Sequence, residues 1–176
     1  MRFIDVCFPR DNEYLFIEVA KKIKTNELIF VYEKKELKKT LNFENIEKNE
    51  LKIHNFWLEK DIYSFKENIK NLKNKLCYID NKFKFPDRLT QVYVKNIKEN
   101  NIRLIISPKI LKNNSYELSK FILFLKLCRK YKIDLFITSL AETPYELKEK
   151  RLLFSFMNIL TRDTNYSKKS LSLFLI

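Results

Sequence analysis

Short runs of β-branched and aromatic residues alternate with longer helical patterns along this chain of 176 residues. The alternation is typical of a parallel α/β sheet, in which a helix follows each strand and returns the chain to the same edge. We therefore predict a single α/β domain over residues 1–176 with about six parallel strands. The expected strands are Phe3–Cys7, Leu28–Tyr32, Leu51–Asn55, Leu76–Ile79, Ile102–Ile106 and Leu135–Thr138.

Between the strands, apolar residues recur every three to four positions, as expected of helices that cover a sheet. Thr143, Pro144 and Glu146 form a capping-box pattern, which predicts a further helix beginning at Pro144. The three expected apolar faces are Ile62, Phe65, Ile69 and Leu72; Leu89, Val92, Tyr93 and Ile97; and, within Ser115–Lys130, Leu118, Phe121, Ile122, Leu125 and Cys128.

Glycine is absent from the sequence. Phosphate-binding loops of the GxGxxG and GxxxxGKS types need glycine, because only glycine lets the backbone approach the phosphates closely. We therefore expect no Rossmann or Walker-type nucleotide site. Backbone positions with positive φ must go to other residues, and asparagine is the nearest substitute. Asparagines stand where helices should end, at Asn26, Asn74, Asn100 and Asn101.

Lysine and arginine outnumber aspartate and glutamate by 35 to 22, which gives a net charge of +13. Such a surface attracts polyanions, so nucleic acid is the first partner to consider, although an A/T-rich coding sequence could produce the same composition. No apolar run is long enough to span a membrane, and no signal peptide opens the chain, which predicts a cytoplasmic protein. Three dispersed cysteines, Cys7, Cys77 and Cys128, are typical of buried thiols in a reducing compartment.

Functional side chains of parallel α/β folds gather where the strands end. Asp5 and Asp80 could hold Mg²⁺ there, although solvated loop carboxylates are the more common case. The single histidine, His54, cannot build a histidine-rich metal site and is expected to be structural. The candidates at the expected strand ends are Asp5, Asn55, Asp80, Ser107, Thr138 and Ser139.

Several basic residues are spaced to share helical faces. Arg88 and Lys95 are seven positions apart, and Lys148 and Arg151 are three apart, so each pair can lie on one side of a helix. The segment 162–169 adds more cations beside a tyrosine, a mixture suited to phosphate contacts and to stacking on bases. A solvated polar face is the alternative interpretation of each group.

The sequence resembles the RNase P protein component 3 family, the thirty-kilodalton subunit of archaeal and eukaryotic ribonuclease P. The segment Lys130–Ala141, with the sequence KYKIDLFITSLA, is similar to the family pattern KYKxxxFxTSSA. Four further segments match the family: Ile105–Pro108 at a strand end, Lys148 with Arg151, Lys168 within SKKSLS, and the opening RFID followed by Arg10-Asp11. The likeness spans nearly the whole chain.

The resemblance implies a TIM-barrel-like fold. This chain has room for only one helix between Pro108 and Lys130, where the family usually has a further strand and helix, so we expect a reduced or incompletely closed barrel. It also implies a subunit that binds the catalytic RNA without cleaving precursor tRNA itself. No catalytic residue, metal ligand or cofactor is expected in the chain; Mg²⁺ serves the RNA.

The family further implies partners: RNase P RNA, protein component 2, other RNase P proteins and, indirectly, precursor tRNA, with no membrane involved. The residues expected to contact RNA are Arg10, Arg88, Lys95, Lys148, Arg151, Lys168 and Lys169. Two alternatives stay open. A small metal-dependent phosphoesterase would hydrolyse a generic phosphodiester with Mg²⁺ or Mn²⁺, and a purely structural interaction protein would retain no RNA at physiological salt.

Overall fold

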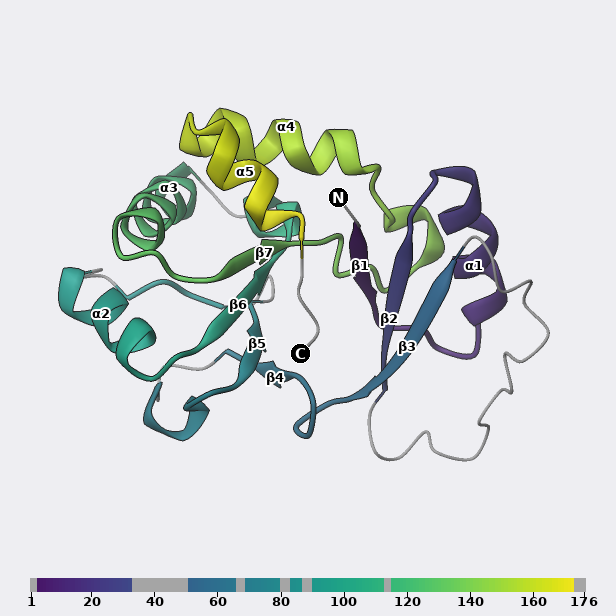
Figure 1. Cartoon of the computed structure of the whole chain (residues 1–176), viewed down its shortest axis with the longest axis horizontal. Helices are drawn as coiled ribbons and strands as arrows, with labels where there is room; N and C mark the ends of the chain where they lie inside the picture. The colour runs from purple at the N-terminus through teal and green to yellow at the C-terminus, as the bar shows by residue number, and fades with distance from the viewer. Residues whose placement is uncertain are drawn as a thin grey trace.

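A computed structural model describes residues 3–32, 51–65, 69–79, 83–86, 90–112 and 115–172 (Figure 1). The strands are β1 Ile4–Cys7, β2 Glu27–Tyr32, β3 Lys52–Trp57, β4 Tyr63–Ser64, β5 Leu76–Tyr78, β6 Arg103–Ile106 and β7 Leu135–Ile137. The α-helices are α1 Glu13–Lys22, α2 Gln91–Glu99, α3 Ser115–Lys130, α4 Lys150–Thr161 and α5 Thr164–Ser170. Short 3-10 helices are η3 Ile69–Leu72, η4 Pro108–Lys112 and η5 Pro144–Glu146.

The strands form two parallel sheets, ordered β1-β2-β3 and β4-β5-β6-β7. They meet where β1 passes the segment after β7, because Cys7 and Ala141 form a parallel bridge. Phe8 N donates to Ala141 O at 2.8 Å, and Ala141 N donates to Val6 O at 3.2 Å. The sheets do not close, so the predicted α/β fold with an incomplete TIM-like barrel is confirmed (Figure 1).

Alternate residues of the strands divide the core into layers, as the period of two in a strand requires. Side chains from both sheets meet in one inner cluster: Ile4, Val6, Ile29, Val31, Ile62, Leu76, Ile105, Phe136 and Leu140. The opposite sides of β5, β6 and β7 pack under α2, α3, α4 and α5 in the largest cluster, which includes Phe121 and Phe124. A third cluster packs α1 and Leu147 against β1 and β2.

The six predicted strands are present with small shifts at their ends, but the structure contains a seventh, β4. The helix predicted through Ile62, Phe65, Ile69 and Leu72 is wrong. Ile62 belongs to the inner cluster and Phe65 to the largest cluster, on the other side of the sheet, so these side chains do not share a helical face. They lie before and after β4, and only Ile69 and Leu72 fall in the short helix η3.

The helix Ser115–Lys130 is confirmed with the predicted bounds. On α2, Ile97 is buried as predicted, but Val92 is 65% exposed and Val94 takes the buried position instead. The capping box at Thr143 caps the N-terminus of the short helix η5 only, and α4 begins later, at Lys150. Lys148 therefore precedes the helix that carries Arg151, which corrects the prediction that both lie on one helix.

Residues other than asparagine fill most of the positive-φ positions in this part of the chain. Asn74 and Asn101 adopt positive φ as predicted. Asn26 and Asn100 do not: Asn100 is the C-cap of α2 with φ of −83°, and Asn26 Oδ1 accepts a hydrogen bond from Phe3 N at 3.0 Å. The remaining described positive-φ residues are Asp11, Lys24, Glu59, Lys132, Leu140 and Arg162.

Candidate functional site

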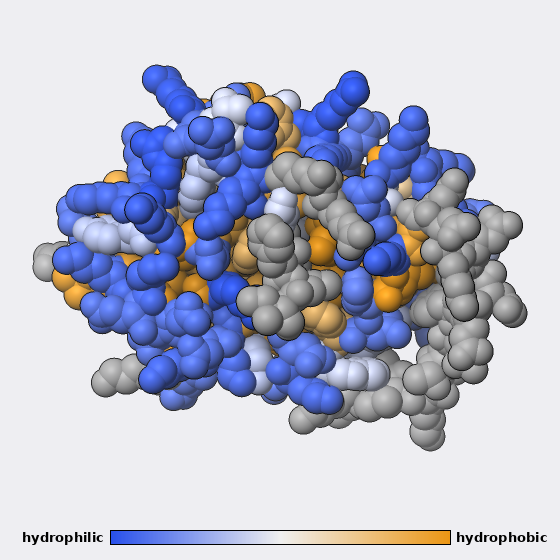
Figure 2. Space-filling view, in the orientation of Figure 1, coloured by the Kyte–Doolittle hydropathy of each residue, from blue (hydrophilic) through white to orange (hydrophobic). Residues whose placement is uncertain are grey.

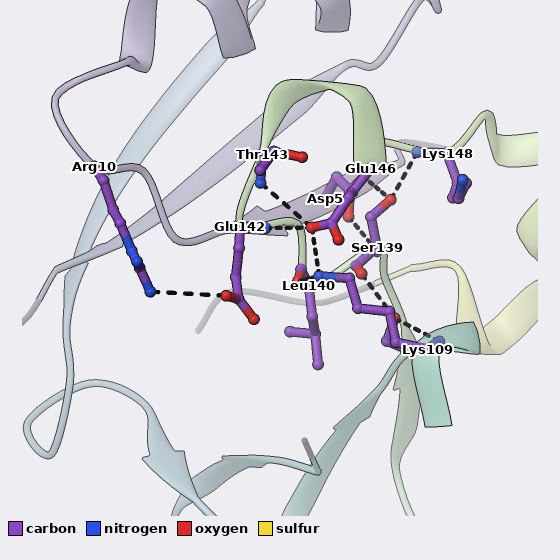
Figure 3. A network of polar contacts seen from close by, with 10 residues as sticks. Asp5, Arg10, Lys109, Ser139, Leu140, Glu142, Thr143, Glu146 and Lys148 are labelled. Atoms are coloured by element: carbon purple, nitrogen blue, oxygen red, sulfur yellow. Dashed lines mark hydrogen bonds and ion pairs between the residues drawn. The ribbon is translucent and has the colours of Figure 1, made fainter. Parts of the chain in front are cut away.

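A buried contact between Asp5 and Ser139 joins β1 to the loop after β7 (Figure 3). Asp5 Oδ1 accepts hydrogen bonds from Ser139 N at 2.6 Å and from Val6 N at 2.9 Å. Its other oxygen, Oδ2, accepts from Ser139 Oγ at 2.6 Å. The serine hydroxyl in turn accepts from Lys148 N at 2.8 Å. One carboxylate therefore links the two sheets and holds the backbone of Lys148.

Lys109 extends this contact from the end of β6. Its Nζ donates to Leu140 O at 2.8 Å and to Glu146 Oε2 at 2.6 Å. Ser107 Oγ donates to Ser139 O at 2.7 Å and accepts from Lys109 N at 3.2 Å. We call Asp5, Ser107, Lys109, Ser139 and Glu146 the strand-exit network. Figure 3 shows Asp5, Lys109, Ser139 and Glu146 converging on the loop after β7. Their hydrogen bonds stabilise the positive φ of 46° at Leu140.

The environment changes the acidity of both carboxyl groups in this network. Burial raises the pKa of Asp5 from 3.8 to about 6, although the hydrogen bonds from Ser139 and Val6 and the charge of Lys109 act in the opposite direction. Burial also acts to raise the pKa of Glu146. The pKa of Glu146 is nevertheless lowered, because hydrogen bonds from Lys109 and from the N–H groups of Glu142 and Thr143 outweigh the effect of burial.

Three of the predicted RNA-contacting residues lie on segments next to the strand-exit network. Arg10 is exposed, and its guanidinium lies 3.8 Å from Glu142 Oε2 across the loop after β7 (Figure 3). Lys148 is half-buried next to Ser139, and Arg151 is exposed in the first turn of α4. Arg10 and Lys148 thus lie on opposite sides of the loop after β7 in Figure 3, and Arg151 follows Lys148 by three residues.

The other predicted cations lie elsewhere. Lys95 is exposed on α2, with its ammonium 5.7 Å from the centre of the Tyr131 ring. Lys168 and Lys169 are exposed on α5, and Lys169 Nζ donates to Asp134 Oδ1 at 3.0 Å. Arg88 lies outside the described residues. The seven predicted residues therefore do not form one patch in the part of the chain that the structure describes.

The remaining candidates at the strand ends have simpler surroundings. Asn55 is exposed, and Asp80 lies outside the described residues. Thr138 is buried, and its hydroxyl has no hydrogen-bond partner among the described residues. His54 Nε2 lies 3.1 Å from Glu27 Oε2, which supports the structural role expected for this histidine.

Sequence reasoning missed Lys109 as a member of the strand-exit network. Its position after Ser107-Pro108 shows only that Lys109 lies near the exit of β6. Its partner Glu146 was expected only as a capping residue. That the ammonium of Lys109 would reach the loop after a different strand depends on the three-dimensional arrangement of β6 and β7.

Metal and thiol chemistry find little support in the described part of the chain. No group of three or more histidine, cysteine, aspartate or glutamate residues within it could hold a metal ion. Both oxygens of Asp5 already accept hydrogen bonds from the protein. Cys7, Cys77 and Cys128 are buried free thiols, and burial raises the pKa of each, so they are poor nucleophiles. Among the described helices, none is long and apolar enough to cross a membrane.

Comparison with known structures identifies a similar chain in the cryo-EM structure of archaeal Ribonuclease P with mature tRNA. The TM-score is 0.65 with 19% sequence identity, and the alignment covers 95% of this chain and 86% of that chain. No family model and no curated protein sequence matches. At this level of identity the likeness establishes a shared fold over almost the whole length.

Proposed function

We propose that this chain is a protein subunit of ribonuclease P, of the component 3 type, which binds and braces the catalytic RNA. The observation that carries the proposal is the fold likeness over 95% of the chain to a component of an archaeal ribonuclease P structure. The resemblance of Lys130–Ala141 and of the Lys148 and Arg151 positions to the component 3 family supports the same assignment. Cleavage of the 5′ leader and its Mg²⁺ belong to the RNA in this proposal.

The strand-exit network supports a binding role over a catalytic one. Asp5 and Ser139 are buried and hydrogen-bonded to each other, and Lys109 donates to Glu146 and to Leu140 O. These groups fix the backbone on which Lys148 lies, while the exposed Arg151 follows on α4. The network therefore holds the backbone of Lys148, and we assign Arg10, Lys148 and Arg151 to phosphate contacts.

A metal-dependent phosphoesterase is the competing enzyme proposal. It needs carboxylates that are free to bind a cation at the strand ends. Asp5 would have to give up hydrogen bonds of 2.6 Å from Ser139 N and Oγ to do so. If the purified chain hydrolysed a generic phosphodiester with Mg²⁺ or Mn²⁺, this alternative would replace the bracing role.

Pairing with protein component 2 requires an apolar docking face, and α4 offers one. Leu152 is 53% exposed and Ile159 is 74% exposed, and seven positions separate them, so they lie on the same side of the helix. We assign this face to the partner. Leu152→Ala/Ile159→Ala should reduce co-purification with component 2, while Val92→Ala on α2, also exposed, should not.

The RNA contacts are tested by measuring affinity for RNase P RNA across a salt series. Lys148→Ala/Arg151→Ala should flatten the slope of log K against log salt by about one for each lost phosphate contact. Lys21→Ala/Lys22→Ala removes the same charge from exposed positions on α1 and should leave the slope nearly unchanged. An equal slope for wild type and Lys148→Ala/Arg151→Ala would remove these two residues from the interface.

A further inference from the structure

A second group of cations lies around Tyr131, away from the strand-exit network. The ammonium of Lys95 lies 5.7 Å from the centre of the Tyr131 ring, and that of Lys130 lies 5.5 Å from it. Lys98 donates from its Nζ to Lys132 O at 3.0 Å, across the gap between α2 and the turn after α3. We call Lys95, Lys98, Lys130 and Tyr131 the strand-start patch.

The topology places the strand-start patch toward the end of the fold where the strands begin. Lys98 lies in the last turn of α2, which leads into β6, and Lys130 ends α3, which leads into β7. Ser107 and Ser139 follow the opposite ends of β6 and β7. Figure 1 shows α2 and α3 at the left margin, away from the loop after β7. The patch and the network are therefore separate surfaces.

The three lysines keep their charge available to an external anion. All three are exposed, and among the described residues none has a carboxylate within ion-pairing distance. Of the two described carboxylates nearest in sequence, Glu99 is an exposed neighbour of Lys98, and Asp134 accepts from Lys169. Figure 2 shows hydrophilic side chains over most of the visible face, including the side where α2 and α3 lie.

The interaction of cations with the helix macrodipole does not account for the grouping of these three lysines. Cations in a last turn stabilise the helix macrodipole, and Lys98 and Lys130 occupy such positions. Lys95 does not, yet it shares one aromatic ring with Lys130 despite the repulsion between their charges. The Tyr131 hydroxyl donates to Gln91 Oε1 at 2.6 Å, which fixes the ring between the helices. Two cations held together on an anchored ring form a preorganised site for a polyanion.

We propose that the strand-start patch is a second RNA-contact surface, so that one chain holds two separate RNA segments, one at each end of its strands. This inference rests on the proposed function and extends it. The phosphate backbone is the expected ligand because the patch offers cations without a shaped pocket for a base. A subunit with two such surfaces braces a folded RNA by fixing the distance between its segments.

The test is the binding stoichiometry of the full chain with a short RNA duplex of about one helical turn, which is too short to reach both surfaces. Analytical ultracentrifugation should find two duplexes on the wild type. It should find one on Lys95→Gln/Lys98→Gln/Lys130→Gln and one on Lys148→Gln/Arg151→Gln. Glutamine keeps the stem and the helix propensity, and a thermal melt checks that each variant is folded.

A charge-matched control, Lys21→Gln/Lys22→Gln/Lys52→Gln, removes three exposed lysines beside the other sheet and should still bind two duplexes. The second surface is refuted if the strand-start variant also binds two. A wild type that binds a single duplex likewise overturns it, whichever variant then loses binding, and leaves the ribonuclease P assignment in place. A wild type that binds no RNA overturns both.

Discussion

The wild-type protein should lose unfolding free energy as the pH rises and Asp5 ionises. Asp5→Asn should not show this loss. Burial raises the pKa of Asp5 from 3.8 to about 6, so the folded protein keeps this proton to a higher pH than the unfolded chain does. The stabilisation by the bound proton is complete below about pH 3.8 and is lost as the pH rises through about 6. Asparagine cannot ionise, so its contribution to the unfolding free energy stays constant.

The expected size follows from the difference between the two pKa values. One pKa unit corresponds to about 1.4 kcal/mol, so the shift from 3.8 to about 6 amounts to about 3 kcal/mol over the whole titration. Between about pH 4.5 and about pH 7.5 the unfolding free energy should fall by about 2 kcal/mol on account of Asp5.

Asparagine can keep most of the contacts of Asp5. Its Oδ1 can accept the hydrogen bonds that Val6 N and Ser139 N now donate. Its Nδ2 can donate to Ser139 Oγ, which already accepts from Lys148 N at 2.8 Å. The Ser139 hydroxyl then loses its acceptor, which costs about 1 kcal/mol at every pH and does not alter the pH dependence.

Urea unfolding at a series of pH values measures the effect directly. The unfolding free energy of Asp5→Asn minus that of the wild type should increase by about 2 kcal/mol from about pH 4.5 to about pH 7.5. Asp11→Asn makes the same chemical change at an exposed position and serves as the matched control. A constant difference for Asp5→Asn would refute the assignment of a raised pKa to the buried carboxyl.

Three further substitutions test the local structure through the unfolding free energy. Lys24→Gly should raise it by about 1 kcal/mol, because lysine there adopts φ of 57° and glycine does so without steric cost. Lys109→Met should lower it by about 1–3 kcal/mol, since Leu140 O and Glu146 lose a charged donor. Phe124→Ala should lower it by about 3–5 kcal/mol, because this ring on α3 is fully buried. Unchanged unfolding curves would contradict each of the three.

The fold class was predictable because strand and helix periodicities differ clearly along most of the chain. The missed strand β4 has two residues, too few to show an alternation. The apolar spacing around it imitates a helix, although Ile62 and Phe65 lie in different core layers. Where a segment is this short, only the packing of the rest of the fold decides its conformation.

The site was predicted in part. Asp5, Ser107 and Ser139 were among the candidates expected near the strand ends, and the structure joins these three by hydrogen bonds. The contribution of Lys109 could not be read from sequence spacing, since its partners are more than 30 positions away. The separation of Lys95 from Lys148 could not be predicted from the sequence either, because the two residues lie toward opposite ends of the strands.

We propose that this chain contributes binding to ribonuclease P and leaves cleavage to the RNA. Affinity purification of the tagged chain from the cells that produce it, followed by sequencing of bound RNA and assay of precursor tRNA cleavage, tests it most directly. We predict that RNase P RNA is enriched and that cleavage disappears once this RNA is degraded. Absence of RNase P RNA from the purified material, or cleavage by the RNA-free chain, would contradict the account.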